Sequence, residues 1–161
     1  MKCVEEGKMA KDKSKYKSKK IEIDGIKFDS KAEGDYYLLL KKYKETGTVK
    51  DFELQPKFVL QEKFKHRFSG NIRSLTYTAD FKVVVQVGQF KIIYVVDVKG
   101  KANETSPLKR KLFLNKYPNI DLRWISKSLK HGDSDGWIDY FELQKIRREN
   151  RKKKTIINYK G

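Results

Sequence analysis

Asp97 and Lys99 stand in an apolar segment of the sequence, at a spacing that a β-strand would turn into a chemical site. Side chains two positions apart on a strand project from the same face, so the carboxylate and the ammonium group would lie side by side. A carboxylate among apolar residues is costly unless a cation compensates it, and Mg²⁺ or Mn²⁺ suits such an oxygen-rich site. The lysine would then stabilise negative charge on a reacting phosphate or help to orient an attacking water.

Asp80 is expected to face the same site from a neighbouring strand. Residues from about 73 to 99 are rich in Val, Ile, Tyr and Phe and predict a long hairpin, with Gly88-Gln89 suited to a type II′ turn. The antiparallel register that this turn imposes places Asp80 directly opposite Asp97, with Cβ atoms about 4.5–5.5 Å apart. Such a pair would bind one cation, whereas a one-residue slip in register would put the two carboxylates on opposite faces.

A predicted helix that precedes the hairpin supplies a third acidic candidate, Glu33. Ser30 and Glu33 have the spacing of a capping box, and apolar residues then recur at helical spacing until Gly47, which predicts a helix over residues 30–46. Capping accounts for Glu33 locally, but the same carboxylate would also complete the acidic cluster, directly or through water. Both roles stay open, and one residue can serve both.

The order of the elements predicts an α/β fold with a central mixed sheet flanked by helices. Proline and glycine mark several of the boundaries between elements. In chain order the predicted elements are a hairpin around Asp24-Gly25, the helix at 30–46, a strand at 49–60 that is bent or broken at Pro56, the hairpin at 73–99, a helix from Ser106-Pro107 to Pro118, a strand at 120–125 and a helix at about 137–151.

The charge of the chain indicates nucleic acid as its partner. The 161 residues carry 38 Lys and Arg against 21 Asp and Glu, a formal net charge of +17. Such an excess favours a polyanion through phosphate neutralisation and counterion release, and an anionic membrane is the lesser alternative. We expect residues 1–20 to form a flexible basic arm, 21–150 one domain and 151–161 a basic tail.

Cysteine content and hydropathy exclude several classes of protein. Cys3 is the only cysteine, which excludes an intramolecular disulfide and a zinc site built from several thiolates. No apolar run approaches the roughly 20 residues of a membrane span, and the start of the sequence lacks the apolar core of a signal peptide. We therefore expect a cytoplasmic protein that makes no membrane contact.

Together these segments resemble the PD-(D/E)XK nuclease superfamily, whose core has the same order of one helix, three strands, one helix and one strand. The resemblance covers about residues 28–125, where Glu33 matches the helical acid, Asp80 the first strand acid and Asp97-Val98-Lys99 the (D/E)XK element. One departure is Ala79, which precedes Asp80 where the superfamily name places a proline. The segments look most like a phage-encoded branch that includes Holliday junction resolvases, and a transposon-end endonuclease family is also similar.

The resemblance implies a restriction-endonuclease-like core and a metal-dependent DNA endonuclease, with Mg²⁺ as cofactor and Mn²⁺ as a substitute. Catalysis would fall to Glu33, Asp80, Asp97 and Lys99, and metal ligation to the three carboxylates and the backbone carbonyl of Val98. The implied substrate is branched DNA, above all a four-way junction, cut by a homodimer in the host cytoplasm of a phage. An endonuclease of the transposon-end or restriction type and a noncatalytic nucleic-acid-binding module stay open as alternatives.

Four basic residues and one amide are secondary candidates. The basic residues Lys109, Arg110 and Lys111 open the second predicted helix, where they would contact phosphates or form a solvated face. Arg73 is a further candidate for contact with DNA. Gln55 would either hydrogen-bond a water at the site or pin the bend at the following proline.

Overall fold

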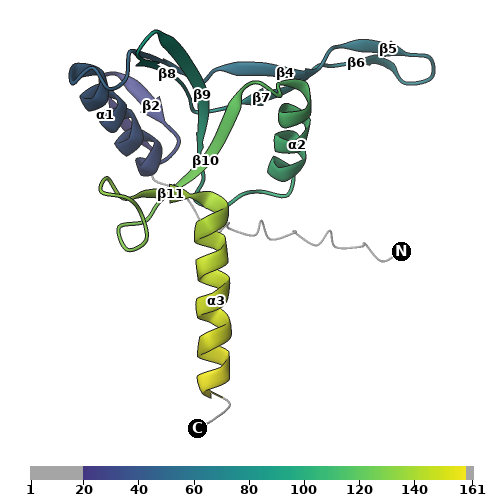
Figure 1. Cartoon of the computed structure of the whole chain (residues 1–161). Helices are drawn as coiled ribbons and strands as arrows, with labels where there is room; N and C mark the ends of the chain where they lie inside the picture. Colours follow the sequence, from purple (N-terminus) through teal and green to yellow (C-terminus); the bar gives the residue numbers. More distant parts are fainter. Residues whose placement is uncertain (1–19, 159–161) are drawn as a thin grey trace, which may run out of the picture.

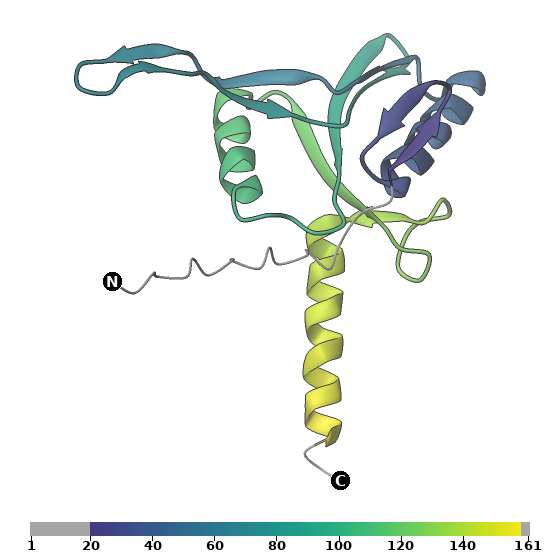
Figure 2. The ribbon, with the colours of Figure 1, turned by 180° about the vertical axis from the view of Figure 1, so that it is seen from behind.

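The computed structural model describes residues 20–158, apart from the side chains of residue 154 and residues 156–158. Its centre is a five-stranded sheet with helices on both faces (Figure 1; Figure 2). The predicted α/β fold with a mixed central sheet is therefore confirmed. The predicted basic arm lies outside the described residues except at its last position.

The central sheet has the strand order β11-β10-β9-β8-β3. Its strands are β3 (Asp51–Leu54), β8 (Phe81–Val87), β9 (Phe90–Val98), β10 (Asp121–Lys127) and β11 (Trp137–Asp139). The pair β9 and β10 is parallel because a helix carries the chain across between them, and the other neighbouring strands are antiparallel. The last four residues of β9 are buried, so the predicted site lies on a central strand.

One face of the sheet is covered by the helix α1 (Lys31–Glu45) and by the hairpin of β1 (Ile21–Ile23) and β2 (Ile26–Phe28). Both elements agree with the sequence prediction. Ser30 caps α1 by accepting a hydrogen bond from the Glu33 amide at 3.2 Å, and Thr46 forms the other cap. In the hairpin turn Asp24 and Gly25 have φ values of 54° and 75°, a conformation that these residue types tolerate.

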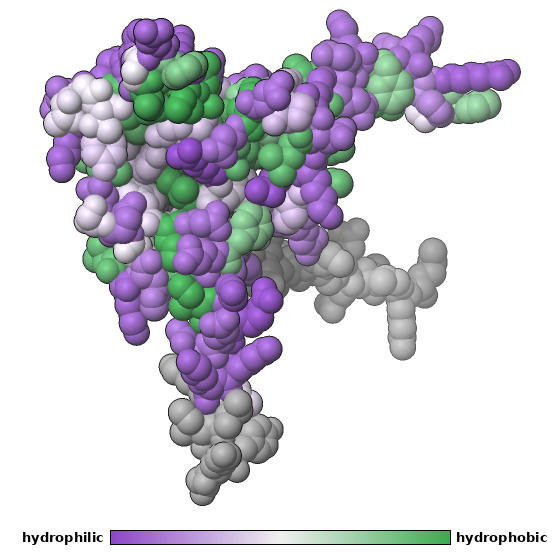
Figure 3. Space-filling view, viewed as in Figure 1, coloured by the Kyte–Doolittle hydropathy of each residue, from purple (hydrophilic) through white to green (hydrophobic). Residues whose placement is uncertain are grey.

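The opposite face is covered by the helix α2 (Ser106–Lys116) and by a two-stranded ribbon of β4 (Lys57–Gln61) and β7 (Leu75–Thr78). Phe113 of α2 is fully buried, and its ring meets that of Phe58 edge-on with centroids 4.9 Å apart. The ribbon continues outward as β5 (Phe64–His66) and β6 (Gly70–Ile72). This outer hairpin projects far beyond the body of the protein (Figure 1; Figure 3).

Two predicted strands are divided in the structure, the first at the predicted break at Pro56 and the second at a position that the sequence does not mark. The stretch at 49–60 forms β3 in the central sheet and β4 in the ribbon, because Gln55, with a φ of 49°, and Pro56 turn the chain between them. The first half of the long predicted hairpin is likewise divided into β7 and β8, with the break at Ala79-Asp80. The outer hairpin of β5 and β6 is not predicted by the sequence pattern.

The last helix, α3 (Tyr140–Asn158), extends away from the sheet (Figure 1). Its predicted start at residue 137 is wrong, because residues 137–139 form β11 against β10. The Asp139 carboxylate accepts hydrogen bonds from the amides of Phe141 at 2.8 Å and Glu142 at 2.9 Å, which starts the helix there. The helix also runs past its predicted end at 151. Within the described residues, no helix has both the length and the apolar character of a membrane span.

Candidate active site

Asp80 lies just before β8, at the end of the ladder between β8 and β9. The predicted register of this hairpin is confirmed, and its regular pairs end with Phe81 opposite Val96. One position further the Asp80 amide donates to the Val96 carbonyl at 3.1 Å. The Asp80 carboxylate accepts a hydrogen bond from the Val98 amide at 2.7 Å. The Asp80 side chain thus adds one hydrogen bond beyond the end of the backbone ladder, and this bond fixes Asp80 beside the segment from Asp97 to Lys99.

Asp97 is the buried acidic residue of the described chain, with 3% of its surface exposed. Its Oδ1 atom lies 2.7 Å from Lys99 Nζ, and its Oδ2 atom accepts a hydrogen bond from the Tyr77 hydroxyl. The Tyr77 oxygen in turn accepts a hydrogen bond from Trp124 Nε1 at 2.8 Å. This relay of hydrogen bonds holds the carboxylate in one orientation, and Lys99 lies beside it as the spacing predicts.

The backbone of Lys99 is held by the neighbouring strand β10. Its amide donates to the Ile125 carbonyl at 2.7 Å, and its carbonyl accepts a hydrogen bond from Ser126 Oγ at 2.6 Å. Ser126 is buried, whereas 21% of the Lys99 side chain is exposed. The backbone of the lysine is therefore fixed, while part of its side chain is exposed to solvent.

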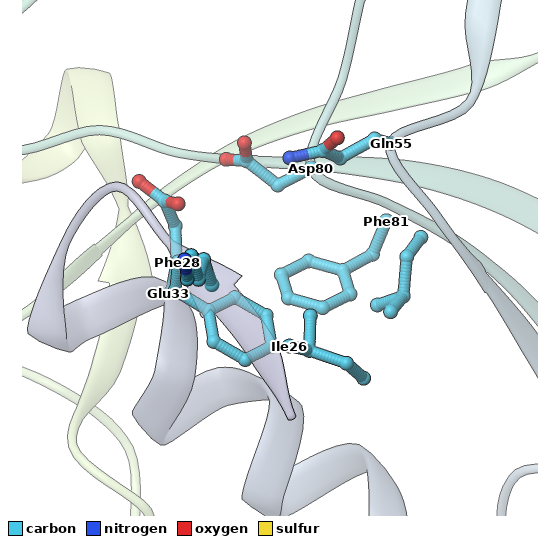
Figure 4. Close-up of a pocket in the computed structure, with 8 residues that line it drawn as sticks. Ile26, Phe28, Glu33, Gln55, Asp80 and Phe81 are labelled. Carbon is cyan, nitrogen blue, oxygen red and sulfur yellow. The ribbon is translucent and has the colours of Figure 1, made fainter. Parts of the chain in front are cut away.

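Glu33, Gln55 and Asp80 line one small cavity between α1 and the edge of the sheet (Figure 4). Its volume is about 170 Å³, and the apolar part of its wall includes Phe28 and Phe81. In Figure 4 the carboxylates of Glu33 and Asp80 are turned toward each other across this space. Glu33 and Asp80 therefore meet at one cavity, although they come from distant parts of the sequence.

The carboxylate of Glu33 also caps its own helix. It accepts hydrogen bonds from Ser30 Oγ at 2.8 Å and from the Asp29 amide at 3.0 Å, and the Ser30 hydroxyl accepts one from the Glu33 amide. Ser30 and Glu33 thus cap the helix reciprocally as the sequence predicts, although the backbone amide that Glu33 accepts from is that of Asp29 and not that of the N-cap residue Ser30. The local role of Glu33 is thus present together with its place on the cavity wall.

Gln55 is fixed through its backbone. Its φ of 49° is unusual for a residue with a side chain, and its amide donates to the Asp80 carbonyl at 2.9 Å. The next residue, Pro56, accepts a hydrogen bond from the Ala79 amide at 3.1 Å. The bend between β3 and β4 is thereby tied to the break before β8, which is the pinning role predicted for this dipeptide. The Gln55 side chain lies on the cavity wall.

The acidic residues of the site repel one another. Burial, followed by the negative charge of Asp97, raises the pKa of Asp80 to about 8, and the charge of Glu33 adds to this. The hydrogen bond from the Val98 amide and the charge of Lys99 act in the opposite direction. Burial and the nearby Asp97 charge also raise the pKa of the Tyr77 hydroxyl above its usual value. The site therefore has more negative charge than Lys99 compensates.

The donor atoms at the site suit a hard divalent cation. Within residues 20–158, no three His, Cys, Asp or Glu side chains are gathered closely enough to hold a metal ion by themselves. Mg²⁺ commonly binds one or two carboxylates and fills its remaining positions with waters and substrate phosphates. The carboxylates of Asp80 and Asp97, together with the backbone carbonyl of Val98 on β9, are a donor set of that kind. The carboxylate oxygens retain further lone pairs beside their present hydrogen bonds.

Arg110 on α2 lies over the same tryptophan ring as Lys99. Its guanidinium carbon is 5.6 Å from the centre of the Trp124 ring and 4.9 Å from that of Phe141, and Lys99 Nζ is 5.4 Å from the Trp124 ring. The Arg110 Nε atom is buried and has no hydrogen-bond partner among the described residues. A guanidinium group that lies against the same aromatic ring as a lysine of the site is a suitable contact for a phosphate.

The other predicted basic contacts are distributed differently. Lys109 donates to the Thr76 carbonyl at 3.2 Å, so it ties α2 to β7. Lys111 is exposed on the same helix, and Arg73 is exposed at the base of the outer hairpin, where it lines a separate hollow. The structure thus brings Arg110 toward the predicted catalytic residues and leaves Arg73 away from their cavity.

Tyr77, Trp124 and Ser126 are residues of this site that the sequence prediction does not include. Each places a polar atom in the protein interior, where it needs a hydrogen-bond partner. Tyr77 and Trp124 stand in apolar segments whose aromatic residues also fit ordinary core packing. A buried carboxylate such as that of Asp97 needs hydrogen-bond donors, and Tyr and Trp carry such donors on side chains that also suit the core. That requirement is the signal that could have identified Tyr77 and Trp124.

Comparison with known proteins gives a family for the chain. No curated protein and no solved structure matches it. Residues 13–133 match one family, and this match includes all of the site residues described above except Phe141, which lies beside Arg110. The chain therefore belongs to the family described as "Protein of unknown function (DUF1064)".

Proposed function

We propose that this protein is a metal-dependent endonuclease that hydrolyses phosphodiester bonds in DNA. The observation that carries the proposal is the 2.7 Å hydrogen bond from the Val98 amide to the Asp80 carboxylate. Val98 lies between Asp97 and Lys99 in the sequence, so this bond holds Asp80 next to the second acidic residue and the lysine at the end of a single hairpin. The resemblance of these residues to the PD-(D/E)XK motif supports the proposal, as does the order of α1, the strands β3, β8 and β9, α2 and β10, which suits a restriction-endonuclease-like core.

In the proposed reaction a water attacks the phosphorus, and the bond from phosphorus to one ester oxygen breaks as that oxygen takes up a proton. Lys99, held 2.7 Å from Asp97, stabilises the negative charge that develops on the phosphate. Mg²⁺ or Mn²⁺, held by Asp80, Asp97 and the Val98 carbonyl, would supply positive charge at the phosphate and lower the pKa of the attacking water. Glu33 would orient that water from the opposite wall of the cavity.

The proposed substrate is branched DNA, with the four-way junction as the first candidate. The net charge of +17 supports a nucleic-acid partner of either linear or branched form. Preference for a junction follows from the resemblance to phage resolvases. Cutting two strands of a junction requires two active sites of related polarity, and a homodimer with two-fold symmetry supplies them.

The proposal is tested with labelled linear, flapped and four-way DNAs of equal length, each with Mg²⁺, with Mn²⁺ and with a chelator. Asp80→Asn and Asp97→Asn should abolish cleavage and leave DNA affinity similar or higher, because each replaces an acidic group and removes no phosphate contact. The matched control is Asp51→Asn, which changes an exposed acidic residue on β3 that pairs with Lys44 of α1. This variant should cleave normally.

Two results would count against this function, and a third would count against the proposed substrate. Cleavage at the wild-type rate by both site variants would remove Asp80 and Asp97 from the mechanism. Tight binding of every DNA without cleavage by the wild type would favour a noncatalytic module. Preferential cutting of the linear DNA would favour an endonuclease of the restriction or transposon-end type. Light scattering of the free and the junction-bound protein tests the homodimer.

A further inference from the structure

The outer hairpin of β5 and β6 has features that the proposed active site does not use. Its pairs are Phe64 with Ile72, Lys65 with Asn71 and His66 with Gly70. All residues of the two strands are exposed except Ile72, which is half-buried. In both views the hairpin reaches away from the sheet and the helices (Figure 1; Figure 2). A hairpin with so little of its surface buried suits a role in binding better than a role in the core.

The two faces of this hairpin differ in chemistry, because successive side chains on a strand point to opposite sides. The apolar face consists of Phe64, His66 and Ile72. The basic face consists of Lys65 and Asn71, to which the same alternation adds Lys63 and Arg73. Both strands line an open hollow of about 590 Å³ at the base of the hairpin. The basic face therefore adjoins a space that an extended ligand could occupy.

The charge and the tip of the hairpin indicate what that ligand is. Residues 63–74 include four Lys and Arg and no Asp or Glu, so the partner is anionic. At the tip, Phe68 is 85% exposed, and the Arg67 guanidinium lies 5.3 Å from the centre of its ring. Phe64 is 46% exposed. Basic side chains interleaved with exposed aromatic rings are the combination that binds a phosphate backbone and stacks on bases.

We propose that the β5–β6 hairpin binds DNA at a branch point, with its basic face on the phosphates and Phe68 stacked on a base. This inference rests on the proposed nuclease function and identifies the element that would recognise its branched substrate. A phenylalanine ring stacks on a base at least cost where the base has already lost a neighbour, at branches, gaps and ends, because within an intact duplex it must first unstack a base step, which costs free energy. The hairpin is thus a recognition element for DNA structure rather than for base sequence.

The hairpin is attached to the active site through the inner part of the same ribbon. The Tyr117 hydroxyl donates to the Val59 carbonyl on β4 at 2.9 Å, and Lys109 donates to the Thr76 carbonyl on β7 at 3.2 Å. Tyr77, the next residue along β7, donates to the carboxylate of Asp97. A base held at the tip would therefore lie at a fixed displacement from the scissile phosphate, and the hairpin would set where the strand is cut relative to the branch.

The test measures binding in the Asp80→Asn background, in which cleavage is expected to be absent. The probes are a four-way junction with 2-aminopurine at the branch point and a linear duplex of equal length. Phe68→Ala should lower junction affinity by about 5- to 100-fold, the effect of losing one stacked base, and should abolish the 2-aminopurine response. Affinity for the linear duplex should change little. Phe68→Trp should keep the junction preference.

A second variant examines the basic face. Lys63→Ala, Lys65→Ala and Arg73→Ala together should reduce the slope of log affinity against log salt by about 3, nearly one for each lost phosphate contact. The matched controls remove an equally exposed aromatic residue and equally exposed lysines elsewhere. They are Phe90→Ala, whose ring is 76% exposed, and the triple variant of Lys42, Lys50 and Lys91. Thermal melting establishes that each variant folds.

The outcomes separate this inference from the proposed function. If Phe68→Ala behaves like Phe90→Ala and both triple variants bind alike, the hairpin is not a DNA-binding element, and wild-type cleavage is unaffected by that result. A change in oligomeric state with unchanged DNA binding would assign the hairpin to a contact between two copies of the chain and overturn the inference. If the wild type does not cleave but the hairpin variants lose junction binding, the inference stands and the nuclease function fails.

Discussion

The Tyr77 hydroxyl donates a hydrogen bond to the buried carboxylate of Asp97, and the two residues lie on strands of different sheets. The same oxygen accepts a hydrogen bond from Trp124 Nε1. Tyr77 therefore positions a proposed metal ligand without contacting the substrate. Removing the Tyr77 hydroxyl would therefore change the orientation of the Asp97 carboxylate without removing that carboxylate.

Tyr77→Phe should lower kcat and leave KM for the junction nearly unchanged, because Asp97 keeps its charge and loses its orientation. The substitution also leaves Trp124 Nε1 without an acceptor in the core, which should cost about 1–3 kcal/mol of unfolding free energy. Tyr117→Phe is the matched control, since that hydroxyl donates to a backbone carbonyl on β4. Equal losses of kcat in the two variants at equal stability would reject the positioning role.

Lys99→Ala should reduce the cleavage rate by about 10²-fold or more, the typical cost of one lost electrostatic stabiliser. It also leaves the Asp97 carboxylate buried without its cation, so the variant should melt earlier. Lys127→Ala breaks an ion pair of the same length with Asp35 on the surface and serves as the control. Kinetics with saturating enzyme at a temperature where Lys99→Ala is folded separate the two effects. A folded variant with the wild-type rate would exclude a catalytic lysine.

Arg110 is expected to contact the phosphate backbone beside the site. Arg110→Ala should raise KM several-fold, and Arg110→Lys should restore only part of the loss, because an ammonium group lacks the planar fork of the guanidinium group that lies over Trp124 and Phe141. The control is Lys111→Ala, which removes the next positive charge on the same helix from an exposed position. If both substitutions have the same small effect, Arg110 has only a packing role.

The raised pKa of Asp80 predicts how stability depends on pH in the absence of divalent cations. Native Asp80 keeps its proton up to about pH 8, whereas the unfolded residue releases it near 3.8. Between these values the native state binds more protons than the unfolded state, so this residue's contribution to stability falls as the pH rises. Relative to Asp80→Asn, the wild type should therefore lose melting temperature between about pH 4 and 8. Parallel melting curves of the two proteins would show that the carboxyl is not perturbed.

The salt dependence of DNA affinity should be steep, with a logarithmic slope of about 6 to 10, because each neutralised phosphate releases counterions. Deleting residues 1–19, which contain many lysines, should lower this slope if the arm grips DNA. An equal slope and equal affinity in the truncated protein would show that the arm is only a solvated segment. Equilibrium binding at several salt concentrations, with one junction and one duplex, supplies both measurements.

The part of the site formed by β8 and β9 is predictable because local chemistry determines its register. Gly88 has a φ of 58°, as the turn requires, and Val87 lies opposite Phe90. From that pair, alternation along the strands places the carboxylates at one end of the hairpin. The prediction fails only at the last step, where Asp80 leaves the regular ladder and bonds to the Val98 amide.

The ribbon could not be predicted in the same way. Alternation along a strand indicates which face is buried and does not identify the neighbouring strand. Pro56 marks the break between β3 and β4, but the apolar pattern continues across Asp80, although the chain changes sheets there as well. The contact of Tyr77 with Asp97 depends on that change. The start of α3 did have a local signal, because Asp139 and Glu142 have the spacing of an N-cap and its third helical residue.

The hairpin of β8 and β9 also has a consequence for the order of events in folding. Asp80 and Val98 are 18 positions apart, so the loop that must close to join them is short and its entropic cost is small. Contacts of such low sequence separation form readily at an early stage. Glu33 must cover a much longer separation, because its helix docks from the other end of the domain. We therefore expect the two strand carboxylates to repel each other in a nascent hairpin before α1 closes over them, so that divalent cations would accelerate folding as well as stabilise its product.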